Sequence, residues 1–268
     1  MFNTNRLIQI FLFITQLPLA GDKVAPVQLS SIQELSEQKD CHLSLGISDW
    51  MPYQGLTKNG QPTGKQVELI QQIVKEVGCS LSYKSMSFPQ GLIELQNGTV
   101  DFQMNASVSE ERKSYSYFSI PYRKEFLLLY STSKYLDKCQ TMNLEALIKD
   151  GFKLGLQKGL VYGPELTRIQ KNRELNSKIY YVDTNIQHVQ LVQQKNLDGV
   201  VDDPIVVSYR STKNVTGDTL SACSIVVSES PISLIFSKKT VSRELVDKFN
   251  RAIRKIQNTR AYQKEWVW

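Results

Sequence analysis

The sequence predicts an α/β fold in which parallel β-sheets are covered by helices. Between residues 43 and 201, short segments typical of strands alternate with segments that have one apolar face, as helices do. One strand segment, FLLLYS at 126–131, is almost wholly apolar and is therefore typical of a buried strand. No internal repeat or low-complexity linker interrupts the pattern. Alternation of this kind favours parallel sheets with helices on their faces.

The first half of the pattern contains three strands and two helices. The first strand is expected at 43–47. The helix after it has one apolar face and ends before Gly78, because glycine commonly terminates helices; that face consists of Val67, Leu69, Ile70, Ile73, Val74 and Val77. A strand at 81–86, a short helix at 90–96 and a strand at 100–104 follow.

The second half continues the alternation. The expected elements are, in order, a strand at 126–131, a helix at 144–149, a strand at 153–156, a helix at 163–171, a strand at 179–182, a helix at 186–194 and a strand at 198–201. This length of chain, 268 residues with 41% apolar content, can bury one large core or two moderate ones.

The charge balance argues against a nucleic-acid-binding protein. Lys and Arg outnumber Asp and Glu by 32 to 26, a net charge of +6, but the excess is spread along the chain and no run of five like charges occurs. We interpret it as an aid to solubility with a mild attraction for anions. No DNA or RNA motif is present.

The first 20 residues are typical of a secretory signal peptide. Arg6 precedes the apolar run LIQIFLFITQLPLA, which is too short and too poorly flanked for a membrane span. We expect cleavage after Ala20, with a cut after Gly21 as the alternative. The mature protein is therefore expected to be soluble and to lie in an oxidising compartment, the periplasm.

A polar segment after the strand at 100–104 has the composition of an anion-binding site. Asn105, Ser107 and Ser109 place amide and hydroxyl groups at alternate positions, and Arg112 stands just beyond them. A guanidinium group matches a carboxylate through two parallel hydrogen bonds. On its own, however, this composition is more typical of a surface loop.

Ligands of open α/β sheets bind beyond the carboxyl ends of the strands. Polar and aromatic residues follow several of the predicted strands, and they are our further candidate ligand-binding residues: Asp49, Trp50, Phe88, Asn105, Ser107, Gln157, Asp202 and Asp203. Two alternatives stay open. Trp50 and Phe88 are also typical of a hydrophobic core, and an Asp before Pro204 is a typical helix N-cap, so that one carboxylate caps a helix while the other faces the ligand.

Eight segments occur in a characteristic order: GISDWMPY (46–53), TGKQVELIQQIVKEVG (63–78), NGTVDFQMNASVSEER (97–112), FSIPY (118–122), FKLGLQKG (152–159), LDGVVDDP (197–204), ISLIFSKK (232–239) and AYQKEWVW (261–268). Together they resemble the family 3 periplasmic solute-binding proteins, the amino-acid-binding components of ABC transporters. The resemblance implies a two-lobe, type II periplasmic binding protein-like fold with a ligand cleft between the lobes.

The resemblance also implies how the chain is divided. Residues 21–124 and 231–268 would form the first lobe and residues 125–230 the second, with crossovers near 122–126 and 228–232. In this family the ligand lies between aromatic side chains, an arginine binds its α-carboxylate and an aspartate of the second lobe binds its α-ammonium. By position these residues are Trp50 and Phe88, Arg112, and Asp203 with Asp202 as the alternative.

The implied function is capture of a small polar solute, most simply an amino acid, by hinge closure, and delivery to an inner-membrane ABC permease. Neither a cofactor nor catalysis is implied, and a monomer is expected. One alternative is a periplasmic sensing module that signals to a receptor. Another is an enzyme similar to cyclohexadienyl dehydratases, which would need an acid or base in the cleft; the available carboxylates are Glu110, Glu111, Asp202 and Asp203.

Four cysteines allow three pairings in an oxidising compartment. Cys41 and Cys79 begin two strands whose starts can lie side by side in a parallel sheet, and Cys139 and Cys223 both fall in the implied second lobe. We therefore expect the disulfides Cys41–Cys79 and Cys139–Cys223. In the cytoplasm, four unbridged buried thiols would be expected instead.

Overall fold

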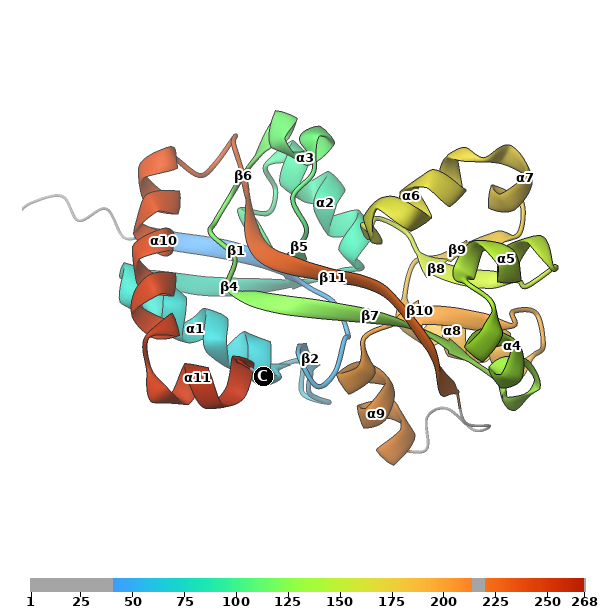
Figure 1. The fold of residues 1–268 in the computed structure, drawn as a ribbon. Helices are drawn as coiled ribbons and strands as arrows, with labels where there is room; N and C mark the ends of the chain where they lie inside the picture. Colours follow the sequence, from blue (N-terminus) through green and yellow to red (C-terminus); the bar gives the residue numbers. More distant parts are fainter. Residues whose placement is uncertain (1–40, 214–219, 268) are drawn as a thin grey trace, which may run out of the picture. The chain divides into compact units, whose positions relative to one another are not determined.

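The computed structural model describes residues 41–213 and 220–267, so the expected signal peptide lies outside the described residues. In the described part, nine strands form one hydrogen-bonded sheet in the order β4-β1-β5-β11-β7-β10-β8-β9, with β6 paired to β11. Two of these strands, β7 (Arg123–Ser131) and β11 (Ser221–Ser237), are long and take part in both lobes of the fold (Figure 1).

The first lobe is built around β1, which pairs in parallel with β4 on one side and β5 on the other. Its elements are β1 (Cys41–Ile47), β2 (Gly55–Leu56), β3 (Pro62–Thr63), α1 (Lys65–Val77), β4 (Cys79–Ser85), α2 (Phe88–Asn97), β5 (Phe102–Ala106), α3 (Glu110–Tyr115), β6 (Ser116–Phe118), α10 (Arg243–Gln257) and α11 (Arg260–Trp266). Its core joins the apolar face of α1 to the stacked rings of Phe102 and Phe236, against which the ring of Phe249 packs edge-on. Burial of these side chains is the main stabilising term of the lobe.

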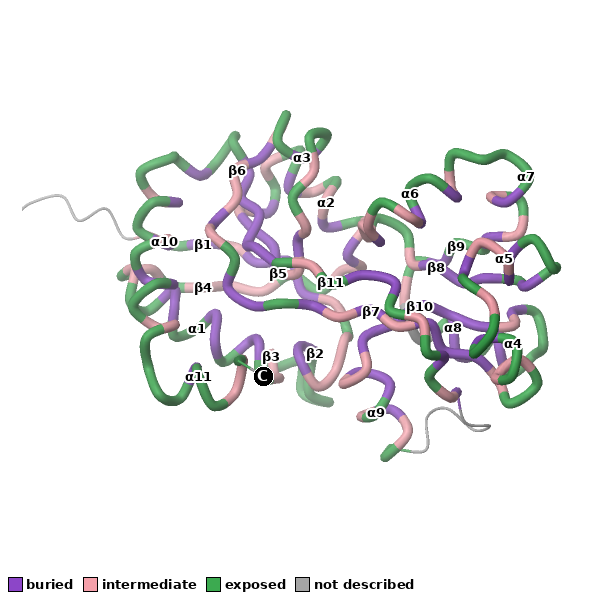
Figure 2. The backbone as a smooth tube through the Cα atoms, in the orientation of Figure 1, coloured by how far each residue is buried: buried purple, intermediate pink, exposed green. Residues whose placement is uncertain are grey.

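The second lobe is built around β8, which lies between β9 and β10 and is parallel to both. Its elements are a short 3-10 helix η2 (Ser133–Tyr135), α4 (Leu136–Thr141), α5 (Leu144–Lys149), β8 (Leu154–Gln157), α6 (Gly163–Lys171), α7 (Arg173–Asn176), β9 (Ile179–Val182), α8 (Asn185–Gln193), β10 (Gly199–Asp202) and α9 (Pro204–Thr212). Its buried segments are separate from those of the first lobe (Figure 2). The fold therefore has two cores joined by long strands.

The expected alternation of strands and helices is confirmed, with one correction. The central strands of each lobe, β4-β1-β5 and β10-β8-β9, are parallel as expected. However, β7 is antiparallel to β10, β11 is antiparallel to β5, β6 and β7, and β2 is antiparallel to β3. The sheet is thus mostly parallel only inside the lobes. The segments expected as crossovers, 122–126 and 228–232, lie at the start of β7 and within β11; the lobe limits derived from them remain a prediction.

Several strand boundaries differ from those expected from the sequence, and two of these differences have identifiable reasons. β5 begins at Phe102 because the Asp101 carboxylate accepts a hydrogen bond from the Ser44 backbone (2.7 Å), which holds the chain just before the strand. β7 begins at Arg123, three residues before the apolar run, because Arg123 and Glu125 are buried as a pair inside it. Gly78 ends α1 in the left-handed conformation (φ 84°), as expected.

Both expected disulfides are present. Cys41 and Cys79 are register partners at the starts of β1 and β4, with Cα atoms 4.6 Å apart. Cys139 of α4 is bonded to Cys223 of β11, with Cα atoms 5.3 Å apart. Across residues 41–213 and 220–267, none of the helices is long and apolar enough to cross a membrane.

Candidate ligand-binding site

A cavity of about 540 Å³ is lined by residues of both lobes and of β7. Its volume is in the range of small-molecule sites. Five of the candidate residues line it: Asp49, Trp50, Phe88, Asn105 and Gln157. Four others do not, namely Ser107, Arg112, Asp202 and Asp203. Glu125 of β7 and Arg210 of α9, which the sequence did not single out, are also in the wall.

Trp50 is held in the wall by an aromatic stack. Its ring lies 4.9 Å from the ring of Tyr53, which in turn lies 6.1 Å from Trp266 of α11. The guanidinium of Arg123 lies over the rings of Trp50, at 5.3 Å, and of Tyr53, at 4.8 Å. Such contacts between a cation and an aromatic face fix the position of the indole.

Phe88 forms a second part of the wall at the start of α2. Ser87 caps this helix by accepting a hydrogen bond from the Gln90 backbone (3.4 Å), and Pro89 occupies the first turn. Phe88 is buried, and the guanidinium of Arg112 lies 5.7 Å from its ring. Trp50 and Phe88 therefore line one cavity, as the aromatic clamp requires, although the clamp itself remains a prediction.

Arg112 is not in the cavity wall but contacts Phe88, which is. Its Nη1 donates to the Ser107 carbonyl (2.7 Å) and its Nη2 to the Gly159 carbonyl of the second lobe. The side chain is buried, and burial lowers the pKa of its guanidinium. Within the described residues, no acidic side chain forms an ion pair with Arg112. Its partners are thus neutral carbonyls, one from each lobe.

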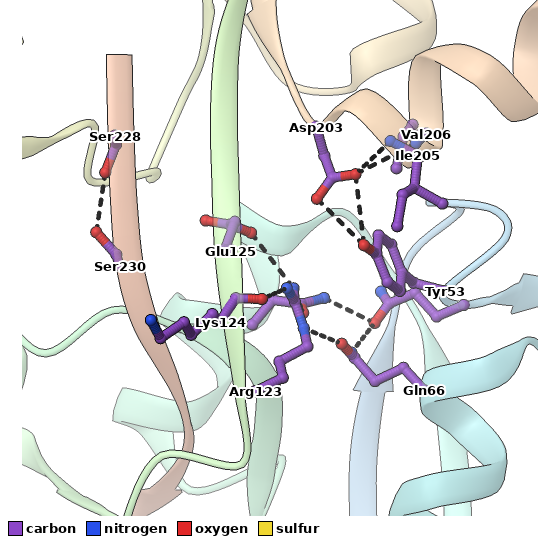
Figure 3. Close-up of polar contacts among 12 residues, drawn as sticks. Tyr53, Gln66, Arg123, Lys124, Glu125, Asp203, Ile205, Val206, Ser228 and Ser230 are labelled. Carbon is purple, nitrogen blue, oxygen red and sulfur yellow. Dashed lines mark hydrogen bonds and ion pairs between the residues drawn. The ribbon is translucent and has the colours of Figure 1, made fainter. Parts of the chain in front are cut away.

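Arg123 and Glu125 form a buried ion pair on β7 (Figure 3). They are two residues apart on a strand and therefore share a face. The Arg123 guanidinium donates to Asn105 Oδ1 (2.7 Å), Gln66 Oε1 (2.8 Å) and, over a longer distance of 3.3 Å, to Glu125 Oε1. Burial raises the pKa of Glu125, against the opposing effect of Arg123.

Asp203 caps helix α9 and contacts the first lobe. Its Oδ1 accepts from the backbones of Ile205 (2.8 Å) and Val206 (3.3 Å), and the Tyr53 hydroxyl donates to its carboxylate at 3.3 and 3.4 Å (Figure 3). Burial raises the pKa of Asp203 to about 6, against the lowering effect of Arg123. The helix-cap alternative is therefore the one that the structure shows for Asp203.

Asp202 is engaged separately. Its Oδ2 accepts from Nη1 of Arg210 (2.9 Å), and its Oδ1 accepts from the Asp203 backbone (2.8 Å). Both side chains of the Asp202–Arg210 pair are nearly inaccessible to water. A buried pair of this kind holds β10 against α9.

The buried charges fall into two groups of opposite sign. Arg112 is a cation that has no ion-pair partner among residues 41–213 and 220–267. The other group, which we call the buried acidic cluster, consists of Arg123, Glu125, Asp202, Asp203 and Arg210. It has three carboxylates and two guanidinium groups, a formal charge of −1. Buried positive charge therefore lies at Arg112, which contacts Phe88 of the cavity wall, and buried negative charge at the cluster, of which Glu125 lines the cavity.

Sequence reasoning missed Glu125, Arg123 and Arg210. A signal existed for the first two: charged residues at alternate positions just before an apolar run share the buried face of the same strand. That these two residues lie in the buried acidic cluster could not be predicted from the sequence. Among the residues that the structure describes, no group of three or more His, Cys, Asp or Glu side chains could hold a metal ion.

The sequence matches the family of bacterial extracellular solute-binding proteins, family 3, over residues 43–266, and the chain belongs to this family. A probable histidine-binding protein of Campylobacter jejuni is 27% identical over 150 residues, which are 55% of this chain and 58% of that protein. The chain thus spans little more than half the length of this relative.

Solved structures show the same fold. The arginine-, lysine-, histidine-binding protein ArtJ of Geobacillus stearothermophilus superposes with a TM-score of 0.69 at 20% identity, over 84% of this chain and 95% of that one. An ancestral amino acid-binding protein, a precursor of cyclohexadienyl dehydratase, gives 0.67 at 23% identity, over 85% and 95%. The type II periplasmic binding protein fold, with two lobes and a cleft between them, is thereby established.

Proposed function

We propose that this protein binds a free amino acid in the cavity between its lobes and delivers it to an ABC permease at the outer face of the inner membrane. The observation that carries the proposal is the separation of buried charge between Arg112 and the buried acidic cluster. An amino acid carries a carboxylate and an ammonium group on the same carbon atom, and Arg112 and the cluster match these two groups in sign.

Arg112 would bind the α-carboxylate. Its guanidinium now donates to two neutral carbonyls, and a carboxylate accepts stronger, charge-assisted hydrogen bonds from the same fork. The Gly159 carbonyl belongs to the second lobe, so movement of that lobe away from the first frees Nη2 for the ligand. Ser107 and Asn105 would contribute further polar groups beside it.

Trp50 and Phe88 would hold the ligand side chain. Aromatic faces attract apolar groups and cations alike, so this part of the site accepts a range of side chains. The names of the relatives favour basic amino acids as the first to be tested: one is a probable histidine-binding protein and another binds arginine, lysine and histidine. Gln157 and Asp49 line the cavity at positions suited to polar contacts.

Binding would be coupled to closure of the lobes. Among the described residues, hydrogen bonds join the lobes from Arg112 to the Gly159 carbonyl and from Tyr53 to Asp203. A ligand that adds contacts to both lobes stabilises the closed form by its differential affinity for that form. The closed form would be recognised by the permease; a signalling receptor is the alternative partner, and the same closure would serve it.

The proposal is tested by a thermal-shift screen of refolded, ligand-stripped protein against the twenty amino acids, small dicarboxylates and polyamines. A ligand at 100 to 1,000 times its dissociation constant stabilises the protein by roughly 3 to 4 kcal/mol. We expect a shift with at least one amino acid, lost in Arg112→Ala and retained in the exposed control Arg168→Ala. Absence of a shift with every amino acid would overturn the proposal.

An enzymatic role is tested in the same series. A dehydratase needs a general acid in the cavity, and the buried carboxyl group of Glu125 is the candidate there. We propose binding without turnover, and incubation with prephenate or arogenate should leave both compounds unchanged.

A further inference from the structure

Among the three carboxylates of the buried acidic cluster, Glu125 alone lines the cavity. Asp202 and Asp203 belong to the second lobe and stand outside the cavity wall, whereas Glu125 lies on β7, the strand shared by both lobes. Its side chain is 9% exposed. The carboxylate that a ligand meets in this cluster is therefore the one on β7.

Glu125 also has spare capacity to accept hydrogen bonds. In the described part of the structure its single hydrogen-bond donor is Arg123, which contacts Oε1. Figure 3 shows the second carboxylate oxygen on the side away from Arg123. A carboxylate can accept about four hydrogen bonds. Asp203, by contrast, already accepts from Tyr53 and from two backbone amides of α9.

Arg123 compensates the charge of Glu125 only in part. Its guanidinium also donates to Gln66, Asn105 and the Lys124 carbonyl, and its distance to Glu125 is the longest of the four. With two arginines against three carboxylates, the cluster retains a formal charge of −1. Burial raises the pKa of Glu125, as expected for an acid whose charge is incompletely balanced. A further cation would complete the balance.

The geometry points to Glu125 as the residue that binds the α-ammonium group of the ligand, through its second carboxylate oxygen. This inference rests on the proposed function and moves to β7 a contact that the resemblance assigned to Asp203. Asn105 lines the same cavity and accepts a hydrogen bond from the same Arg123. The ammonium contact would thus be made on the shared strand, before the second lobe closes.

Ligands that lack either the carboxylate or the ammonium group test the two predicted contacts one at a time. The probes are L-histidine, histamine, which lacks the carboxylate, and 3-(imidazol-4-yl)propanoic acid, which lacks the ammonium; L-arginine, agmatine and 5-guanidinopentanoic acid form a second set. Each is titrated by calorimetry into the wild type, Glu125→Gln and Glu125→Asp. The matched control is Glu229→Gln, an exposed acid on the neighbouring strand β11, where it pairs with Lys124.

We expect Glu125→Gln to weaken binding of the amino acid and of the amine by about 10- to 100-fold, the range of a charge-assisted hydrogen bond. The deaminated acid should bind the variant as tightly as the wild type, or more tightly. Glu125→Asp should retain part of the affinity, and Glu229→Gln should match the wild type. Thermal unfolding verifies that each variant is folded.

Two results would overturn the inference alone. Equal weakening of all three members of a probe set would mean that Glu125 acts through Arg123 as a structural residue. Unchanged affinity for an amino acid that the wild type binds would mean that Glu125 does not touch the ammonium, while the proposed function would stand. Failure of the wild type to bind any amino acid in the screen would overturn the proposed function, and this inference with it.

Discussion

The hydroxyl group of Tyr53 lies 3.3 Å from Oδ2 of Asp203, although the two residues are 150 positions apart in the sequence. Tyr53 follows the first strand of the first lobe, and Asp203 caps α9 of the second lobe. Both side chains are buried. The contact therefore joins the lobes at the edge of the candidate site, and its energy depends on whether the lobes are closed.

Replacing Tyr53 with Phe removes this contact while keeping the ring that stacks on Trp50. The closed form should lose roughly 0.5 to 1.5 kcal/mol, because one net hydrogen bond contributes that much. We expect amino-acid affinity to fall about 3- to 10-fold by calorimetry. Tyr83→Phe, which removes a hydroxyl bonded to Gln71 on the outside of the first lobe, is the control. Identical affinities of Tyr53→Phe and wild type would show that the contact does not support closure.

The Asp203 carboxyl makes stability depend on pH. Its pKa is raised by burial to about 6, compared with about 3.9 for an unperturbed aspartate. Between about pH 4 and pH 6 the folded protein therefore binds more protons than the unfolded chain, so the free energy of unfolding falls as the pH rises through this window. The full loss is at most about 3 kcal/mol, and it is present above pH 6.

Asp203→Asn tests this directly, since Asn keeps the helix cap without the charge. In urea unfolding at pH 4, 5, 6 and 7, the stability of the variant relative to wild type should increase up to about pH 6 and then level off. The Asp203 charge is also one cause of the raised pKa of Glu125, so its removal lowers that pKa and changes the difference in the same direction. Asp183→Asn, at an exposed position, is the control variant. A difference that is independent of pH would rule out the raised pKa.

Each disulfide should contribute strongly to stability. The bonds close loops with sequence separations of 38 and 84 residues, for which the chain-entropy argument gives roughly 4 to 5 kcal/mol each. Dithiothreitol should therefore lower the urea midpoint of the wild type and leave a variant with all four cysteines replaced by Ser unaffected. Equal midpoints for the wild type with and without reductant would contradict this.

Gly64 should be far less tolerant of substitution than Gly60. Both have positive φ, 120° and 74°, but a Cβ at Gly64 would lie 2.4 Å from the Tyr53 carbonyl, whereas a Cβ at Gly60 meets nothing within 4 Å. We expect Gly64→Ala to cost about 3 kcal/mol or more and to displace Tyr53, and Gly60→Ala to cost about 1 kcal/mol. Chemical denaturation of the two variants compares them; similar losses would contradict the difference.

The sequence predicted those features that depend on local patterns. The apolar face of α1, its stop at Gly78 and the side-by-side starts of two parallel strands each follow from a period or a spacing, so both the helix and the Cys41–Cys79 bond could be anticipated. The Cys139–Cys223 bond needed the division into lobes that the family resemblance supplied.

What could not be predicted depends on contacts between distant segments. Arg123 and Glu125 look like the polar end of a strand, and only their burial against Asn105 and Gln66 makes them part of the site. From the sequence, Asp203 could either cap a helix or bind the ligand. Its hydrogen bonds with Tyr53 and with the first turn of α9 show that it caps the helix. β11 was overlooked because its 17 residues pair with different strands along its length and so follow no single period.

The most direct test of the central claim is a crystal structure of the protein grown with the amino acid that gives the largest thermal shift. We predict that its α-carboxylate will be bonded to the guanidinium of Arg112, its α-ammonium to Glu125 in the buried acidic cluster, and that its side chain will lie against Trp50 and Phe88. An amino acid bound without contact to Arg112, or crystals that take up none at millimolar concentration, would contradict the account.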